Sequence, residues 1–231
     1  MNRPRQNLII DADDTLWENN LYFEAAFADF VNFLGHSHLD AAQIRAIFDE
    51  MEIANIRVNG YGAANFARNL TNCYRRLAER EIRDEDIKQV LQFGQRILDQ
   101  PIELLDGVAE TLGYLSAHHE LTLFTKGDAE EQNWKIERSG LSRYFVHTAV
   151  VREKDAPAYA QLVAERSLEP ARTWMIGNSP KSDVNPALAI GLNAVFIPHT
   201  MTWSLEQQEI LAEANGRLLR LDRFAELRDH F

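Results

Sequence analysis

The chain is organised around one segment, Leu8-Ile9-Ile10-Asp11-Ala12-Asp13-Asp14-Thr15-Leu16-Trp17. It begins with three apolar residues that are typical of a buried strand, and three carboxylates follow within four positions. Like charges this close disfavour one another's ionised form unless a cation shares the site. A hard divalent ion meets that need, because Mg²⁺ typically binds one or two carboxylates together with substrate phosphate oxygens.

A carboxylate can also act as a nucleophile and form an aspartyl-phosphate. We therefore interpret Asp11 as the nucleophile and Asp13, two residues later, as a general acid/base. The competing interpretation is an acidic turn after a strand, capped by Thr15. This segment alone does not decide between the two.

The composition is that of an ordinary globular protein, with 45% hydrophobic and 26% charged residues among 231. The formal net charge of −11 disfavours nucleic acid as a partner, and no apolar run reaches the length of a membrane span. The single cysteine, Cys73, excludes an intramolecular disulfide and favours a reducing compartment. We expect a cytoplasmic protein that is a monomer or a small homo-oligomer.

The pattern from residue 18 to residue 100 is helical. Phe23, Phe27, Phe30 and Leu34 form one apolar stripe, and further helices are predicted after Asp40, over 63–80 and after Asp84. About eighty residues of helix exceed a simple crossover between two strands. We therefore predict an inserted helical subdomain over 18–100, with a core domain formed by 1–17 and 101–231.

The pattern changes after residue 100 to short strands that alternate with helices. Strands are predicted at 121–124, 144–146, 174–176, 194–197 and 218–221, with a last helix near 205–214. This alternation indicates βαβ units and an α/β fold with a Rossmann-like, doubly wound parallel sheet.

Polar residues stand where the predicted strands end, and ligands of open parallel sheets bind beyond the carboxyl ends of their strands. Asp11 and Asp13 follow the first strand, and Thr125 with Lys126 follows the second. Lys154 comes shortly after the third strand. The loop from Gly177 to Asp183, which includes Asn178, follows the fourth. Four separate segments thus converge on one predicted site.

These four segments resemble, in the same order, the four motifs of the haloacid dehalogenase (HAD) superfamily. The resemblance implies that Asp11 attacks a phosphoryl group and that Asp13 protonates the leaving group and later deprotonates water. It implies that Thr125 and the backbone amide of Lys126 hold phosphoryl oxygens, and that Lys154 neutralises charge. The metal ligands implied for Mg²⁺ are Asp11, Asp13 through its carbonyl, Asn178 and Asp183.

Two residues separate the subclasses within this resemblance. Many family members carry Asp where this chain has Asn178, which removes one negative charge from the metal site. The dehalogenases of the family lack an acid at the position of Asp13, because a halide leaves without a proton. Asp13 therefore favours phosphoryl transfer.

The helical insert resembles a C1-type cap, a lid that excludes water and selects the substrate. Within it, residues 55–62 are the expected specificity loop, with Arg57, Asn59 and Tyr61 as candidate contacts to the leaving group. An ordinary solvent-facing helix connection is an equally good interpretation of this segment.

The resulting hypothesis is a Mg²⁺-dependent phosphomonoesterase that acts on a small phosphorylated metabolite. The alternatives are a phosphomutase, a dehalogenase-type hydrolase, or a degenerate member that only binds a ligand. Asn178 keeps the last alternative open.

Overall fold

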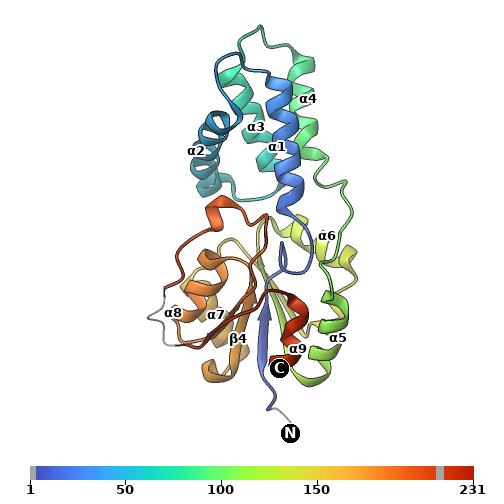
Figure 1. Ribbon diagram of the computed structural model, residues 1–231, viewed down its shortest axis with the longest axis vertical. Helices are drawn as coiled ribbons and strands as arrows, with labels where there is room; N and C mark the ends of the chain where they lie inside the picture. Colours follow the sequence, from blue (N-terminus) through green and yellow to red (C-terminus); the bar gives the residue numbers. More distant parts are fainter. Residues whose placement is uncertain (1–3, 212–215) are drawn as a thin grey trace. The chain divides into compact units, whose positions relative to one another are not determined.

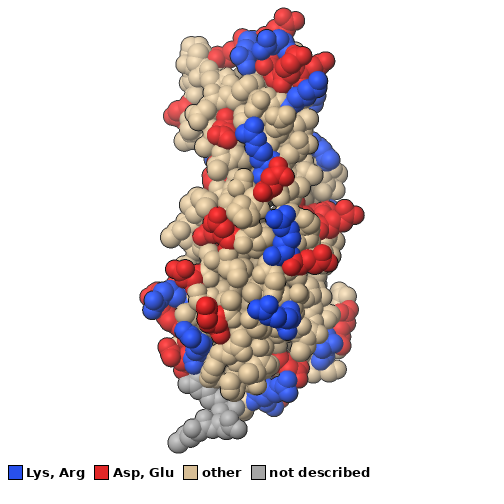
Figure 2. Space-filling model, turned by 90° about the vertical axis from the view of Figure 1, so that its right-hand side faces the viewer, with Lys and Arg blue, Asp and Glu red and all other residues tan. Residues whose placement is uncertain are grey.

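The computed structural model describes residues 4–211 and 216–231. The chain forms two compact units: the α/β unit, Met1–Asn20 with Ile102–Phe231, and the helical unit, Leu21–Pro101 (Figure 1). Among the described residues on the face drawn in Figure 2, acidic and basic side chains are interspersed and form no continuous basic patch. No helix in the described part of the chain is long and apolar enough to cross a membrane.

The α/β unit is built on a six-stranded sheet in the order β3-β2-β1-β4-β5-β6, and every pairing is parallel. The strands are β1 (Asn7–Ile10), β2 (Glu120–Lys126), β3 (His147–Val151), β4 (Thr173–Gly177), β5 (Asn193–Phe196) and β6 (Leu218–Arg220). The predicted fold class is confirmed, and β1 lies between β2 and β4 in the middle of the sheet.

Helices cover both faces of this sheet (Figure 1). They are α5 (Val108–His118), α6 (Ala129–Ser139), α7 (Ala156–Arg166), α8 (Asn185–Ala189) and α9 (Leu227–His230). Side chains of a strand alternate between faces, so Leu8 and Ile10 pack into the core under α5 and α9. Ile9 points the other way, into the core formed with α7 and α8.

The helical unit contains α1 from its second residue onward (Asn20–Leu34), α2 (Ala41–Asn59), α3 (Ala63–Leu77) and α4 (Asp84–Gln95). Its core is aromatic: Phe48 packs against Phe27 and Phe66 with ring centroids 5.3 Å apart in both pairs. Asp40 begins α2 with a reciprocal capping box to Gln43, as its position before the apolar run predicts.

Two predicted elements are wrong. Residues 144–146 are not a strand, because Tyr144 ends a 3₁₀ turn (Ser142–Tyr144) and Val146 is 61% exposed. The strand is β3, an edge strand whose partial exposure makes its sequence less apolar than that of a central strand.

The helix predicted near 205–214 is reduced to a 3₁₀ turn at Ser204–Glu206, and residues 207–211 are not helical. Residues 212–215 of this prediction lie outside the described part. The described backbone bonds across to α8 instead, since Asn185 donates to the Glu209 carbonyl and accepts from the Leu211 amide. These contacts replace the bonds that a helix would make within itself.

Candidate active site

Asp11 is the first residue after β1 and is 8% exposed. Its backbone amide donates to the Ile176 carbonyl and so extends the pairing with β4. Thr15 Oγ1 donates to Asp11 Oδ2 at 2.9 Å, and Lys154 Nζ donates to Asp11 Oδ1 at 2.7 Å. Both carboxylate oxygens are therefore held at the carboxyl end of the central strand.

Lys154 joins two of the predicted site residues, since it also pairs with Asp183. Burial alone would lower the pKa of Lys154, but the charges of Asp11 and Asp183 outweigh that effect and raise it. Burial and then the nearby charge of Asp11 raise the pKa of Asp183 to about 7. Two carboxylates thus share one buried ammonium, an arrangement that a further cation would stabilise.

Asp183 is brought to this place by a single π-helical turn, Pro180–Val184, after β4. The Ser179 amide donates to Asp183 Oδ2 at 2.9 Å. A Cβ at Gly177 would overlap the Asp183 carboxylate, so the glycine at the end of β4 is required by this close approach. π-helical turns are rare and occur frequently at functional sites.

Asn178 is buried beside this pair. Its Oδ1 accepts from Thr15 Oγ1 at 3.3 Å, and its Nδ2 donates to Thr202 Oγ1 at 3.1 Å. The amide oxygen therefore faces the segment that carries Asp11, and that Asn178 is a metal ligand stays a prediction.

Thr125 and Lys126 lie at the end of β2, with Thr125 buried. The sequence predicted a role for the backbone amide of Lys126 only. In the structure its side chain donates to Ser182 Oγ at 2.9 Å and pairs with Glu206 at 2.5 Å. Glu206 Oε2 also accepts from Ser179 Oγ at 2.7 Å. The turn that presents Asp183 is thereby tied to β2.

Glu206 is a residue that sequence reasoning missed. Burial alone would raise the pKa of its carboxyl, but Lys126 and the hydroxyls of Ser179 and Ser182 outweigh burial and lower it. Its partner Lys126 is 80 positions away in the chain, and no local pattern signals such a contact.

Asp13 is surrounded by hydrogen-bond donors. Trp17 Nε1 donates to its Oδ1 at 2.8 Å and Gln132 Nε2 to its Oδ2 at 2.8 Å. Lys135 Nζ reaches both oxygens, at 3.0 and 2.9 Å. Gln132 and Lys135 were not predicted as site residues. One sequence signal could have identified them. Gln132 and Lys135 are spaced i, i+3 on α6, next to the apolar Ile136, and this spacing places them on a buried face of the helix.

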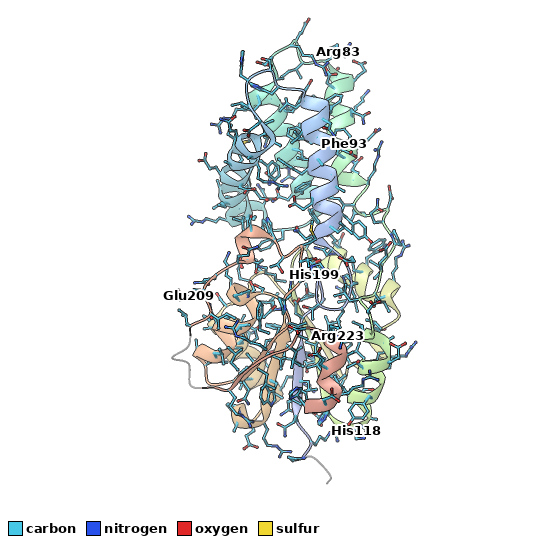
Figure 3. All side chains as sticks on the ribbon, viewed as in Figure 1. Arg83, Phe93, His118, His199, Glu209 and Arg223 are labelled. Carbon is cyan, nitrogen blue, oxygen red and sulfur yellow. The ribbon has the colours of Figure 1, made fainter. Side chains whose placement is uncertain are left out.

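A second acidic cluster consists of Asp14, Glu18 and His199, whose possible ligand atoms lie within 4.8 Å of one another. His199 is labelled in Figure 3. Asp14 accepts from the amides of Asn19 and Asn20 at the start of α1. Burial is the main reason that the pKa of Asp14 is raised to about 7. This cluster shares no member with the predicted magnesium ligands, and His199 Nδ1 is already occupied by the Met201 amide.

The predicted specificity loop is mostly helix. Arg57 and Asn59 belong to the last turn of α2, and Gly60 (φ 76°) is the C-cap that follows it. Only residues 60–62 form the connection from α2 to α3. Asn65 Nδ2 donates to the Gly60 carbonyl at 2.6 Å and fixes this helix end. Tyr61 lies in the short connection. That Arg57, Asn59 and Tyr61 contact a leaving group stays a prediction.

Comparisons with known proteins agree with the fold. Residues 6–191 match the family model of haloacid dehalogenase-like hydrolases. The chain belongs to this family. It is a hydrolase of the HAD type, as the resemblance of its motifs implied.

One solved structure is similar enough in sequence to support the same assignment. It is a haloacid dehalogenase-like hydrolase from Xanthomonas campestris, with 33% identity, a TM-score of 0.84, and coverage of 98% of this chain and 90% of that one. No curated protein matches the chain.

More distant structures share the fold. A predicted phosphoglycolate phosphatase from Haemophilus somnus is 15% identical, with a TM-score of 0.65 and coverage of 98% and 97%. The L-2-haloacid dehalogenase from Xanthobacter autotrophicus is 12% identical, with a TM-score of 0.65 and coverage of 97% of each chain. The fold thus accompanies both phosphatase and dehalogenase chemistry, and the choice rests on the site residues.

Proposed function

We propose that this hydrolase is a Mg²⁺-dependent phosphomonoesterase that acts on a small phosphorylated metabolite. The observation that carries the proposal is a second carboxylate two residues after the nucleophile. Asp13 follows Asp11 by two residues in sequence, and Asp11 belongs to a buried group with Lys154 and Asp183. A displacement of halide needs neither a proton donor nor a metal-binding carboxylate pair, whereas phosphoryl transfer from an alkoxide leaving group to Asp11 uses both.

The donor set fits a magnesium ion. The carboxylates of Asp11 and Asp183, the amide oxygen of Asn178 and the carbonyl of Asp13 offer only oxygen, which Mg²⁺ prefers. The Asp11 and Asp183 carboxylates share one ammonium group, so their local charge is negative. A bound Mg²⁺ would supply additional positive charge to the phosphoryl oxygens and to these carboxylates.

The first chemical step follows from the placement of Asp11. One carboxylate oxygen attacks phosphorus, the bond from phosphorus to the leaving oxygen breaks, and Asp13 gives that oxygen a proton. Lys154 stabilises the negative charge of Asp11 and the phosphoryl group. Thr125 Oγ1 and the Lys126 amide hold phosphoryl oxygens.

In the second step Asp13, now ionised, takes a proton from water while the water oxygen bonds to phosphorus. The bond from phosphorus to Asp11 breaks, its electron pair returns to the Asp11 carboxylate, and phosphate is released. We also propose that the helical unit acts as a C1-type cap, with Arg57, Asn59 and Tyr61 as contacts to the leaving group.

The test is phosphate release with Mg²⁺ across a library of phosphorylated metabolites and p-nitrophenyl phosphate, with halide release from 2-chloropropionate assayed beside it. We expect Asp11→Asn and chelation each to remove turnover by at least about 10³-fold, while Asp29→Asn, an exposed change on α1, has no effect. Halide release without phosphate release would instead establish a dehalogenase. Absence of both from a folded wild-type protein would contradict an enzymatic role for this site.

A further inference from the structure

The side chain of Lys135 on α6 is buried, although a lysine is almost never buried without a partner. It contacts Asp13 at 2.9 and 3.0 Å, Glu131 at 3.5 Å and Asn19 Oδ1 at 2.9 Å. The mechanism above assigns it no role. A buried ammonium loses its hydration by water, which costs free energy. The contact of Lys135 with the proposed acid/base, Asp13, therefore needs an explanation.

The groups around Asp13 define how its carboxylate can bond. A lysine ammonium and a tryptophan indole only donate hydrogen bonds. Gln132 also donates here, because its Oε1 accepts from Thr125 Oγ1 at 3.4 Å and its Nε2 therefore faces Asp13. In its ionised form, which follows the first step, Asp13 accepts at both oxygens, and three donors fix the orientation of the plane of the carboxylate.

Gln132 links this arrangement to the residue that is proposed to bind the phosphoryl group. One end of its amide meets Thr125 and the other meets Asp13. A Cβ at Gly127 would come within 2.9 Å of Gln132 Nε2, so a glycine with φ of 148° leaves room for the side chain. Gln132 and Lys135, one turn apart on α6, reach Asp13 together.

We propose that Lys135, together with Gln132, is a positioning residue that holds Asp13 as the hydrogen-bond acceptor required in the second chemical step. This inference rests on the proposed phosphatase function. In that step a water proton passes to an Asp13 oxygen and the water oxygen bonds to phosphorus. The bond from phosphorus to Asp11 breaks, and its electron pair returns to the Asp11 carboxylate. Lys135 exchanges no proton and acts by fixing the oxygen that receives one.

The test compares Lys135→Met with Arg138→Met, which removes an exposed cation one turn later on the same helix. p-Nitrophenyl phosphate with Mg²⁺ is the substrate, because p-nitrophenolate leaves without needing a proton. We expect kcat of Lys135→Met to fall about 100-fold. We expect kcat/KM to change less than about threefold, because it reports the first step. Rapid-quench experiments should show a burst of p-nitrophenolate and accumulated phosphoenzyme in Lys135→Met only.

Lys135→Arg restores a donor and should recover most of kcat, which a purely structural loss would not predict. If kcat and kcat/KM fall together in Lys135→Met, or if Lys135→Met matches Arg138→Met, the positioning role is wrong while the phosphatase function stands. If the wild type releases no phosphate in an Asp11-dependent manner, the proposed function itself fails, and the inference fails with it.

Discussion

Asp183 of the α/β unit and Glu52 of the helical unit are both buried carboxyl groups, but their surroundings differ. In the α/β unit, Lys154 pairs with both Asp11 and Asp183, and the backbone amide of Ser179 donates a further hydrogen bond to Asp183 Oδ2. In the helical unit, Glu52 is buried near two other acids, and its burial raises the pKa of its carboxyl to about 8. Opposite charges meet at Asp183, whereas at Glu52 the acids Asp49 and Glu24 outnumber the one cation, Arg45.

The helical unit also leaves polar atoms without a hydrogen bond. Among the described residues of this unit, Asp49 Oδ1, Asn65 Oδ1 and Asn69 Nδ2 are buried and make none. Its stability comes from the aromatic core around Phe48, and the buried Glu52 reduces it. The buried charges of the α/β unit are partnered at the strand ends, where chemistry requires fixed groups.

Lys154→Met tests the buried ion pairs of the α/β unit, and we expect it to have the largest effect. It leaves the carboxylates of Asp11 and Asp183 buried without their shared cation. We expect the free energy of unfolding of the α/β unit to fall by about 3–5 kcal/mol in metal-free buffer. All four tryptophans, Trp17, Trp134, Trp174 and Trp203, belong to this unit, so intrinsic fluorescence reports its unfolding selectively.

Arg166→Met is the matched control, because it removes an exposed cation from α7 of the same unit. It should shift the fluorescence transition by less than about 0.5 kcal/mol. An equally small shift for Lys154→Met would show that the two carboxylates do not depend on the ammonium, and the contrast between the units would be lost.

Glu52 makes the helical unit sensitive to pH. Its ordinary pKa is 4.5 and its native pKa is about 8, so between these values the native state keeps a proton that the unfolded state has released. The free energy of unfolding should therefore fall as the pH rises through this window, by about 1.4 kcal/mol per pH unit, and the loss is complete above pH 8. Burial is the main cause. The charges of Asp49 and Glu24 add to it, and Arg45 opposes it.

Glu52→Gln should remove this slope and stabilise the helical unit at pH 8, with little effect near pH 4.5. Far-ultraviolet circular dichroism and amide hydrogen exchange in α2 and α3 provide the measurement. Glu50→Gln, an exposed change on the same helix, should keep the wild-type slope. A wild-type helical unit that is equally stable at pH 5 and pH 8 would contradict the assignment of Glu52.

Glu206→Gln weakens the bridge between β2 and the turn that carries Asp183. We expect a loss of about 2 kcal/mol at pH 7, measured by tryptophan fluorescence, because a charged acceptor of Lys126, Ser179 and Ser182 becomes neutral. The pKa of Glu206 is lowered in the native state, so its contribution is present above its ordinary value of 4.5 and is lost as the pH falls. The difference from wild type should therefore close in acid.

Glu209→Gln, an exposed change three residues later, is the control for this bridge. It should leave the fluorescence transition in place at every pH. If both variants behave alike, Glu206 does not hold the turn.

The sequence predicted the strand-end residues well, for a physical reason. Central strands such as β1 and β4 are apolar on both faces, so the polar residues that follow them are conspicuous. Because parallel strands end at one edge of the sheet, Asp11, Lys154 and Asp183 could be predicted to meet, and the structure brings these three into contact. The fold class followed from the same alternation of strands and helices.

The hydrogen-bond and ion-pair partners of these strand-end residues could not be predicted from the sequence. Lys135 is 122 positions from Asp13, and in sequence it is one cation on an ordinary helix. The segment around Glu206 has an apolar pattern that suits a helix, but contacts with Lys126 and Asn185 determine its conformation. Long-range pairing overrides local preference at these places, and a single sequence does not show it.

Asn178→Asp has the smallest expected effect, and it tests whether Asn178 binds a magnesium ion in the α/β unit. A carboxylate in place of the amide adds negative charge next to Asp11 and Asp183, so the metal-free protein should lose stability. If Asn178 is a magnesium ligand, the same charge strengthens metal binding, and the Mg²⁺ concentration for half-maximal phosphate release should fall about tenfold, or about 1.4 kcal/mol. The stabilisation produced by a fixed excess of Mg²⁺ should increase by a similar amount in fluorescence-monitored unfolding. Both changes must appear together, because a carboxylate that merely crowds the site would destabilise the protein without altering its response to Mg²⁺. That result would leave Asp11 and Asp183 as the side chains that hold the ion.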